Sequence, residues 1–226
     1  MTENKELLKT IEFKSFTFPA ARDALRAYAS LDERTKQGMV TCYREFEKPP
    51  WNDDPYDPDK LINFDFPKML TTFTPGGLVV ATNTQGDVVG FASGGQSSLM
   101  DLVTKKYDKA TADQQLLIAD SIQRQTGLRD SDTFMYENEL VVTGLDEYRN
   151  QGIGTRLSSD RQQIFEQMGY GAILGRSLNP YLLMMKDTLF SNQSGFSLTK
   201  FIPDGDPYVN PVTGTKRTIY FATKTR

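Results

Sequence analysis

The chain has 226 residues, of which 38% are hydrophobic and 24% are charged, and its formal net charge is −3. This size and balance predict a single soluble, globular domain over residues 1–226 with one substantial core. The net negative charge argues against nucleic acid as a partner. Because no long apolar run occurs, we expect neither a signal peptide nor a membrane span, and a cytoplasmic location follows by default.

Cysteine and histidine usage excludes several kinds of catalyst. The chain has no histidine and one cysteine, Cys42, which lies at helical spacing from Met39 and Phe46. Without histidine, the chain cannot form a Ser-His or Cys-His nucleophile, and it lacks the most common zinc ligand. The spacing of Cys42 is typical of a buried apolar side chain. The acidic run 53–59 lacks the glycine and terminal glutamate of a calcium loop, so we expect no metal.

The first part of the chain predicts strands and helices in a regular order. Residues 11–18 alternate between apolar and polar, as in a half-buried strand. Asp32 can cap a helix that begins at residue 33. The turn Gln85-Gly86-Asp87 separates two apolar runs and predicts a hairpin. The predicted elements are a strand at 11–18, helices at 19–30 and 33–46, a mixed segment at 61–73, and hairpin strands at 77–82 and 88–92.

The most informative motif is Arg149-Asn150-Gln151-Gly152-Ile153-Gly154. It follows the apolar run Leu140-Val141-Val142 and opens a helical apolar pattern over residues 152–168. A glycine turn between a strand and a helix N-terminus makes an anion cradle, because main-chain N–H groups point out of it. A dinucleotide fingerprint is excluded because Leu157 stands where that motif has its third glycine. A P-loop is excluded because Gly-Lys-Ser/Thr is missing.

This motif resembles the acyl-CoA pyrophosphate loop, Arg-x-x-Gly-x-Gly, of the GNAT family of N-acetyltransferases. The resemblance covers roughly residues 133–200 and continues in the family's order, with a strand at 170–175, Asn179, a helix at 180–190 and Gly195-Phe196. It implies an α/β fold with a central mixed, mostly antiparallel twisted sheet flanked by helices. Two final strands are expected at 196–201 and 218–223.

One departure from the family is a helical insertion between its third and fourth strands, at residues 94–131. Thr111 and Gln114 predict a capping box, and Gly127 can end the helix. Leu116, Leu117 and Ile118 supply apolar side chains. Three interpretations stay open for this insertion: a packing appendage, a homodimer surface, or a part of the acceptor site.

The resemblance implies transfer of an acetyl group from acetyl-CoA to a primary amine of a small molecule or protein, by direct attack. The CoA-binding residues would be the main chain of Arg149, Asn150, Gln151, Gly152, Ile153, Gly154 and Thr155, together with Asn179 for the pantetheine arm. A backbone N–H near Val141 or Val142 would polarise the thioester carbonyl. The alternative function is a catalytically weak acyl-CoA-binding or protein-interaction module.

The acid and base of such a reaction are only partly indicated. The family uses a glutamate on its fourth strand as the base, and Glu137 and Glu139 share one face of that strand. Each has the alternative role of a solvated residue or ion-pair partner. The family's tyrosine acid falls on Ser191, which matches it poorly, and Tyr181 at the start of the same helix is the substitute, unless it packs on the sheet. Water is the remaining proton donor.

The acceptor side of the family corresponds to the loop that contains Trp51, Asp53, Tyr56 and Asp57 in this chain. Aromatic rings beside carboxylates suit a cationic amine through cation–π contact and charge attraction. A solvated proline-rich turn would have the same composition. Both interpretations of this loop are kept.

Overall fold

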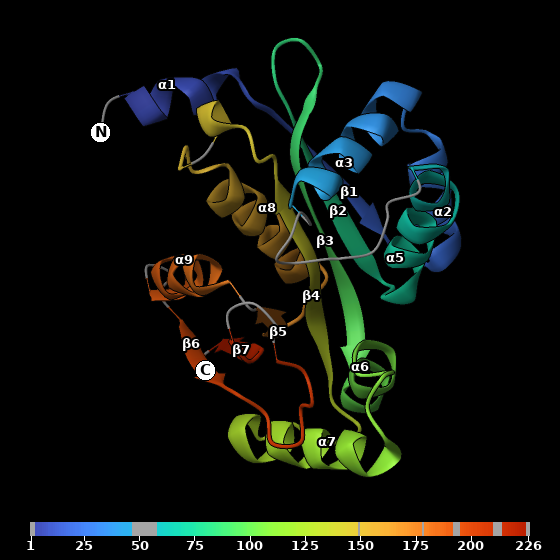
Figure 1. The fold of residues 1–226 in the computed structure, drawn as a ribbon, viewed down its shortest axis with the longest axis vertical. Coiled ribbons are helices and arrows are strands. Elements are labelled where there is room, and N and C mark those ends of the chain that lie inside the picture. The colour runs from blue at the N-terminus through green and yellow to red at the C-terminus, as the bar shows by residue number, and fades with distance from the viewer. Residues whose placement is uncertain are drawn as a thin grey trace. The chain divides into compact units, whose positions relative to one another are not determined.

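The computed structural model describes residues 3–46, 58–148, 150–177, 179–191, 195–209 and 214–224, and Figure 1 shows their ribbon. None of the helices in these residues is long and apolar enough to cross a membrane. The described elements are α1 (Glu3–Thr10), β1 (Glu12–Phe18), α2 (Ala21–Ala29), α3 (Glu33–Phe46), α4 (Pro58–Lys60), the π-helical turn η1 (Leu61–Asp65), α5 (Phe66–Thr72), β2 (Gly76–Thr82), β3 (Val88–Ser98), α6 (Leu99–Lys106), α7 (Ala112–Thr126), β4 (Thr133–Val142), the 3-10 turn η2 (Asp146–Tyr148), α8 (Ile153–Gln167), β5 (Ala172–Ser177), α9 (Pro180–Ser191), β6 (Phe196–Phe201) and β7 (Thr218–Lys224).

The strands of the described residues form one sheet in the order β1-β2-β3-β4-β5-β7-β6. β4 and β5 are parallel, whereas β1–β2, β2–β3, β5–β7 and β6–β7 are antiparallel, which confirms the expected mixed, mostly antiparallel α/β fold. The chain divides into two compact units. Unit 1 consists of Met1–Gly95 and Asn138–Met168, and unit 2 of Gln96–Glu137 and Gly169–Arg226, so β3 and β4 each contribute residues to both.

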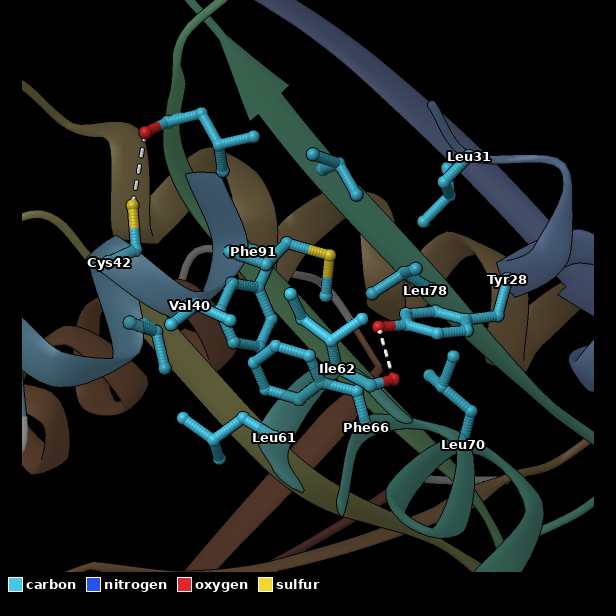
Figure 2. Close-up of a cluster of buried hydrophobic side chains, with 14 of the residues drawn as sticks. Tyr28, Leu31, Val40, Cys42, Leu61, Ile62, Phe66, Leu70, Leu78 and Phe91 are labelled. Atoms are coloured by element: carbon cyan, nitrogen blue, oxygen red, sulfur yellow. Dashed lines mark hydrogen bonds between the residues drawn. The ribbon is translucent and has the colours of Figure 1, made fainter. Parts of the chain in front are cut away.

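The core of unit 1 lies where β2 and β3 meet the helices between β1 and β2. Alternate residues of a strand face opposite sides of the sheet. Leu78 and Val80 therefore enter a cluster with Phe66 and Phe91, drawn in Figure 2. A Cβ built on Gly77, on the other side of β2, would approach Ile164 of α8 to 2.9 Å. α8 therefore covers the face of β2 opposite this cluster. The hydrophobic cluster and α8 pack on opposite faces of the same strand.

Two polar side chains inside this core are satisfied by main-chain carbonyls. The Tyr28 hydroxyl donates to the carbonyl of Ile62 at 2.9 Å, and the Cys42 thiol contacts the carbonyl of Val88 at 3.0 Å (Figure 2). Both residues are buried, so the expected apolar role of Cys42 is confirmed. Burial also raises the pKa of the Tyr28 phenol well above its usual value, because the phenolate would lose its hydration.

The helix and turn signals of the sequence are confirmed in detail. The Asp32 carboxylate accepts a hydrogen bond of 2.7 Å from the N–H of Thr35 and caps α3. Thr111 and Gln114 form the predicted capping box of α7, and Gly127 ends that helix with a φ of 72°. Gly86 in the β2–β3 hairpin has a φ of 83°, a conformation that glycine adopts without strain.

The structure adds to the expected elements at two places and corrects them at a third. The polar N-terminal segment forms α1, which the composition did not suggest. The mixed segment 61–73 is helical. β3 continues through Gly94 and Gly95 to Ser98, so the helical part of the insertion begins only at Leu99. Residue 95 must be glycine because a side chain there would overlap the main chain of Phe73.

In unit 2 the insertion supports the loop between β6 and β7. Arg124 of α7 forms an ion pair with Asp204 at 2.8 Å, and the N–H of Asp204 donates to the Ser121 hydroxyl at 3.0 Å. Ile118 is buried, whereas Leu116 and Leu117 are about half exposed. These contacts agree with the interpretation of the insertion as a packing appendage.

Candidate functional site

The predicted anion cradle lies in unit 1, between β4 and α8. Gly152 is the N-cap of α8, with a φ of 81°, and Asn150 is the described non-glycine residue with positive φ, at 58°. The N–H of Arg156 makes a hydrogen bond of 3.0 Å to the carbonyl of Gly152. The N–H groups of Ile153, Gly154 and Thr155 precede that bond, and no side chain caps them. Arg149 lies outside the described residues. The segment Asn150 to Thr155 combines a positive-φ turn with a helix N-terminus, the two features on which the expected anion site depends.

A buried arginine joins α8 to the two strands beneath it. The Nη1 group of Arg161 donates to the carbonyl of Ser93 on β3 at 2.9 Å and to the carbonyl of Glu139 on β4 at 2.6 Å. The residue is only 1% exposed. The helix that begins at the cradle is therefore tied to the middle of β4 by a charged donor, a link that the sequence analysis did not anticipate.

Main-chain groups of β4 alternate between its two edges. The N–H of Thr143 donates to the carbonyl of Val89 at 2.9 Å, and a Cβ on Gly90 would lie 2.7 Å from the carbonyl oxygen of Val141. Residues 139, 141 and 143 therefore turn their polar groups toward β3. In an extended strand the neighbouring residues face the other way. By this alternation we expect the N–H of Val142, rather than that of Val141, on the edge away from β3.

Glu137 lies in unit 2 as part of a buried polar cluster. Its side chain is 1% exposed and forms an ion pair of 2.5 Å with Lys186 of α9, whose side chain is fully buried. The Tyr220 hydroxyl on β7 donates a hydrogen bond to the same carboxylate oxygen. The ammonium of Lys186 also lies 5.3 Å from the centre of the Tyr220 ring. Neither Lys186 nor Tyr220 was singled out from the sequence, although a lysine directly after the apolar run 181–185 was a signal.

Glu139 belongs to unit 1 and differs from Glu137 in exposure. Glu139 is half-buried, whereas Glu137 is buried. The two glutamates are therefore distinct candidates. One is held by two named donors in the interior, and the other has its main chain fixed by Arg161.

The remaining candidates in unit 2 lie at or near the start of α9. The Asn179 carboxamide oxygen caps that helix by accepting a bond of 2.9 Å from the N–H of Tyr181, which leaves its amino group as the donor for a ligand. Tyr181 is 79% exposed, so the alternative of packing on the sheet is wrong. Ser191 ends α9, and the position of its side chain lies outside what the structure describes.

A second polar cluster in unit 2 surrounds Tyr107 at the end of α6. The guanidinium of Arg176 lies 5.2 Å from the centre of its ring and that of Arg217 lies 4.8 Å away. Arg217 is also paired with Asp206 at 2.6 Å. Burial raises the pKa of the Tyr107 phenol to about 12. Its hydroxyl has no hydrogen-bond partner among the described residues.

The acceptor-loop candidates Trp51, Asp53, Tyr56 and Asp57 lie outside the described residues. Among the described residues no group of three or more carboxylate or thiol side chains is arranged to hold a metal ion.

Comparison with known proteins rests on structure alone. No sequence profile of a known protein family matches the chain, and no curated protein matches it. A GCN5-related N-acetyltransferase from Kribbella flavida is similar with a TM-score of 0.52 and 13% identity, over 96% of this chain and 99% of that one. Arylalkylamine N-acetyltransferase 2 from Aedes aegypti is similar with a TM-score of 0.51 and 13% identity, over 94% and 98%.

A chain of the NatC complex, solved with a Gag peptide and CoA, has a TM-score of 0.51 and 12% identity, over 96% of this chain and 99% of that one. These likenesses extend over nearly the whole chain although the sequence identity is low. They therefore concern the fold rather than the sequence. The chain therefore has the fold of the GCN5-related N-acetyltransferases.

Proposed function

We propose that the protein is an acetyl-CoA-dependent N-acetyltransferase. The observation that carries the proposal is the uncapped N-terminus of α8 at the glycine turn, which follows β4 directly as an anion cradle. The CoA pyrophosphate binds the main chain from Asn150 to Thr155, helped by Arg149, and the Asn179 amino group donates to the pantetheine arm. The NatC neighbour was solved with CoA, and the fold supports the same cosubstrate here.

The chemistry requires a polarised carbonyl and a neutral amine. In this proposal the N–H of Val142 donates to the thioester oxygen, where negative charge develops as the amine attacks. An alkylamine has a pKa near 10.4, so its neutral form costs roughly 4 to 5 kcal/mol at pH 7. A carboxylate of β4, Glu137 or Glu139, takes the proton as the C–N bond forms and the C–S bond breaks.

The thiolate leaving group requires little help. A thiol of pKa near 8.5 leaves readily, and water supplies its proton. Tyr181 is the side-chain alternative because its hydroxyl is exposed at the start of α9. Ser191 is the weaker alternative, because a serine hydroxyl is short and only weakly acidic.

The acceptor in this proposal is a cationic primary amine. The Aedes aegypti neighbour is named for its action on arylalkylamines, which supports an amine acceptor on this fold. The loop that contains Trp51, Asp53, Tyr56 and Asp57 attracts it by charge and by cation–π contact.

The direct test measures CoA release from acetyl-CoA with a panel of amines, alongside the melting temperature with CoA alone. The proposal expects both transfer and thermal stabilisation. Stabilisation without transfer to any amine would favour the catalytically weak acyl-CoA-binding module instead. A melting temperature that does not respond to CoA would contradict both functions.

A further inference from the structure

Glu137, Gly175 and Tyr220 form a row across three neighbouring strands of unit 2. Glu137 of β4 pairs with Gly175 of β5, and Gly175 pairs with Tyr220 of β7. A Cβ at Gly175 would overlap the Tyr220 hydroxyl and ring. Glycine at this position therefore lets the phenol cross β5 and reach the Glu137 carboxylate.

The third member of the cluster comes from a helix. The Lys186 ammonium of α9 meets the same carboxylate oxygen at 2.5 Å, and the lysine side chain is wholly buried. The ammonium also lies 5.8 Å from the centre of the Phe190 ring, so aromatic faces add to its environment. Removing two charges from water is expensive, and packed apolar side chains would stabilise a core at least as well. A stability role alone therefore does not account for the cluster.

Two charged side chains next to the members of this cluster have other partners. Arg176, next to Gly175, donates to the carbonyl of Lys106 and lies against Tyr107. Asp187, next to Lys186, pairs with Lys200 of β6 at a half-exposed site. The Glu137 carboxylate itself contacts the Lys186 ammonium and the Tyr220 hydroxyl.

We infer that Lys186 and Tyr220 are positioning residues for Glu137, which is the catalytic base of the proposed acetyl transfer. This inference rests on the proposed function. A carboxyl group buried as deeply as Glu137 favours its neutral form, which accepts no proton. The adjacent Lys186 ammonium favours the ionised form, and the Tyr220 hydroxyl holds one carboxylate oxygen in place.

The test compares Lys186→Met and Tyr220→Phe with the parent chain in acetyl transfer from acetyl-CoA to spermidine, tyramine and aniline. Lys200→Met is the matched control, because it breaks a lysine–carboxylate pair of the same length, 2.5 Å, between α9 and β6. Rates are measured from about pH 6 to about pH 10, where the alkylamines carry a proton over most of the range and aniline does not.

We expect Lys186→Met to lower kcat/KM for the alkylamines by about 100-fold near pH 7. The pH of half-maximal kcat/KM should rise by roughly 1 to 3 units, because the opposite charge that favours the carboxylate is gone. Tyr220→Phe should cost roughly 10-fold, the effect of one hydrogen bond to a charged group. Transfer to aniline should change by less than about 3-fold in both variants, since aniline requires no base.

Equal losses for aniline and the alkylamines, or a pH profile of Lys186→Met that matches Lys200→Met, would overturn the inference and leave the cluster a structural role. If Lys186→Met does not fold, the test uses Lys186→Arg and Tyr220→Phe. Lys186→Arg should keep the pH profile of the parent chain, and Tyr220→Phe should still lose roughly 10-fold in kcat/KM. A changed profile in Lys186→Arg together with full activity in Tyr220→Phe would overturn the inference. A parent chain that acetylates none of the amines and is not stabilised by CoA would refute the proposed function itself.

Discussion

The guanidinium of Arg161 donates a hydrogen bond of 2.6 Å to the carbonyl of Glu139, so that α8 and β4 are joined by a buried cation. The same nitrogen donates to the carbonyl of Ser93 on β3. Because α8 begins at the glycine turn, this one side chain connects the proposed pyrophosphate cradle to the strand that carries the proposed base and N–H donor. In unit 1, the position of the cradle relative to the strand thus depends on Arg161.

Arg161→Met should lower the free energy of unfolding by about 2 to 4 kcal/mol, because two buried carbonyls lose a charged donor. Urea denaturation measures this difference. Arg34→Met is the control in the same unit, since Arg34 is 61% exposed and pairs with the 54% exposed Asp87 at 2.7 Å. Its loss should be below about 1 kcal/mol. Similar losses in the two variants would show that Arg161 contributes no more than a surface pair.

Gly154→Glu should abolish stabilisation by CoA. A carboxylate in the first turn of α8 blocks the close approach of a phosphate and repels its charge. In the parent chain, CoA at a thousand times its Kd should stabilise by about 4 kcal/mol, readily seen as a shift of Tm. Gln163→Glu adds the same charge to an exposed position further along the helix and should leave the shift unchanged. A CoA response that survives Gly154→Glu would place the ligand elsewhere.

Tyr107→Phe should reduce the loss of stability at high pH. The unfolded phenol ionises near pH 10, whereas burial holds the pKa of folded Tyr107 at about 12. Unfolded chains therefore lose this proton first, and stability falls between these two pH values by about 1.4 kcal/mol per pH unit. Tyr107→Phe lacks this pH-dependent loss of stability. The buried Tyr28, whose pKa is also raised, causes a similar loss in the parent chain and in the variant.

At pH 7 the same variant should be neutral or more stable by up to about 2 kcal/mol, because the Tyr107 hydroxyl has no hydrogen-bond partner among the described residues. Denaturation at neutral pH and near pH 11 gives both comparisons. A clear destabilisation at neutral pH would mean that the hydroxyl has a partner in the folded protein.

The double substitution Asp53→Asn with Asp57→Asn should raise the acceptor KM for polyamines and make it less sensitive to salt. In the parent chain that KM should increase with ionic strength, because charge attraction is screened over about 10 Å at 0.1 M salt. Neutral amino acids should be poorer acceptors. A polyamine KM that responds neither to salt nor to the substitutions would exclude this loop from recognition and direct attention to the insertion.

Much of the fold was determined locally, and the sequence by itself predicted it. Helix α3 and strand β6 have their predicted bounds, since apolar spacing, caps and glycines act within a few residues. The glycine turn before α8 was predicted for the same reason. The continuation of β3 through Gly94 and Gly95 was missed because it depends on pairing with Gly77 and Gly76 of β2, and the need for glycine at 95 depends on contact with Phe73, distant in sequence.

The site chemistry depends on contacts that no local pattern contains. Glu137 and Tyr220 are 83 positions apart, and they meet only because Gly175 lies between them in the strand order. Lys186 meets them because α9 covers that row. The sequence by itself determined which residues could serve as base or cradle, because those roles follow from residue type and spacing. Only the tertiary structure decided that one glutamate is buried with two donors and the other half-exposed, because strand register and helix packing set their surroundings.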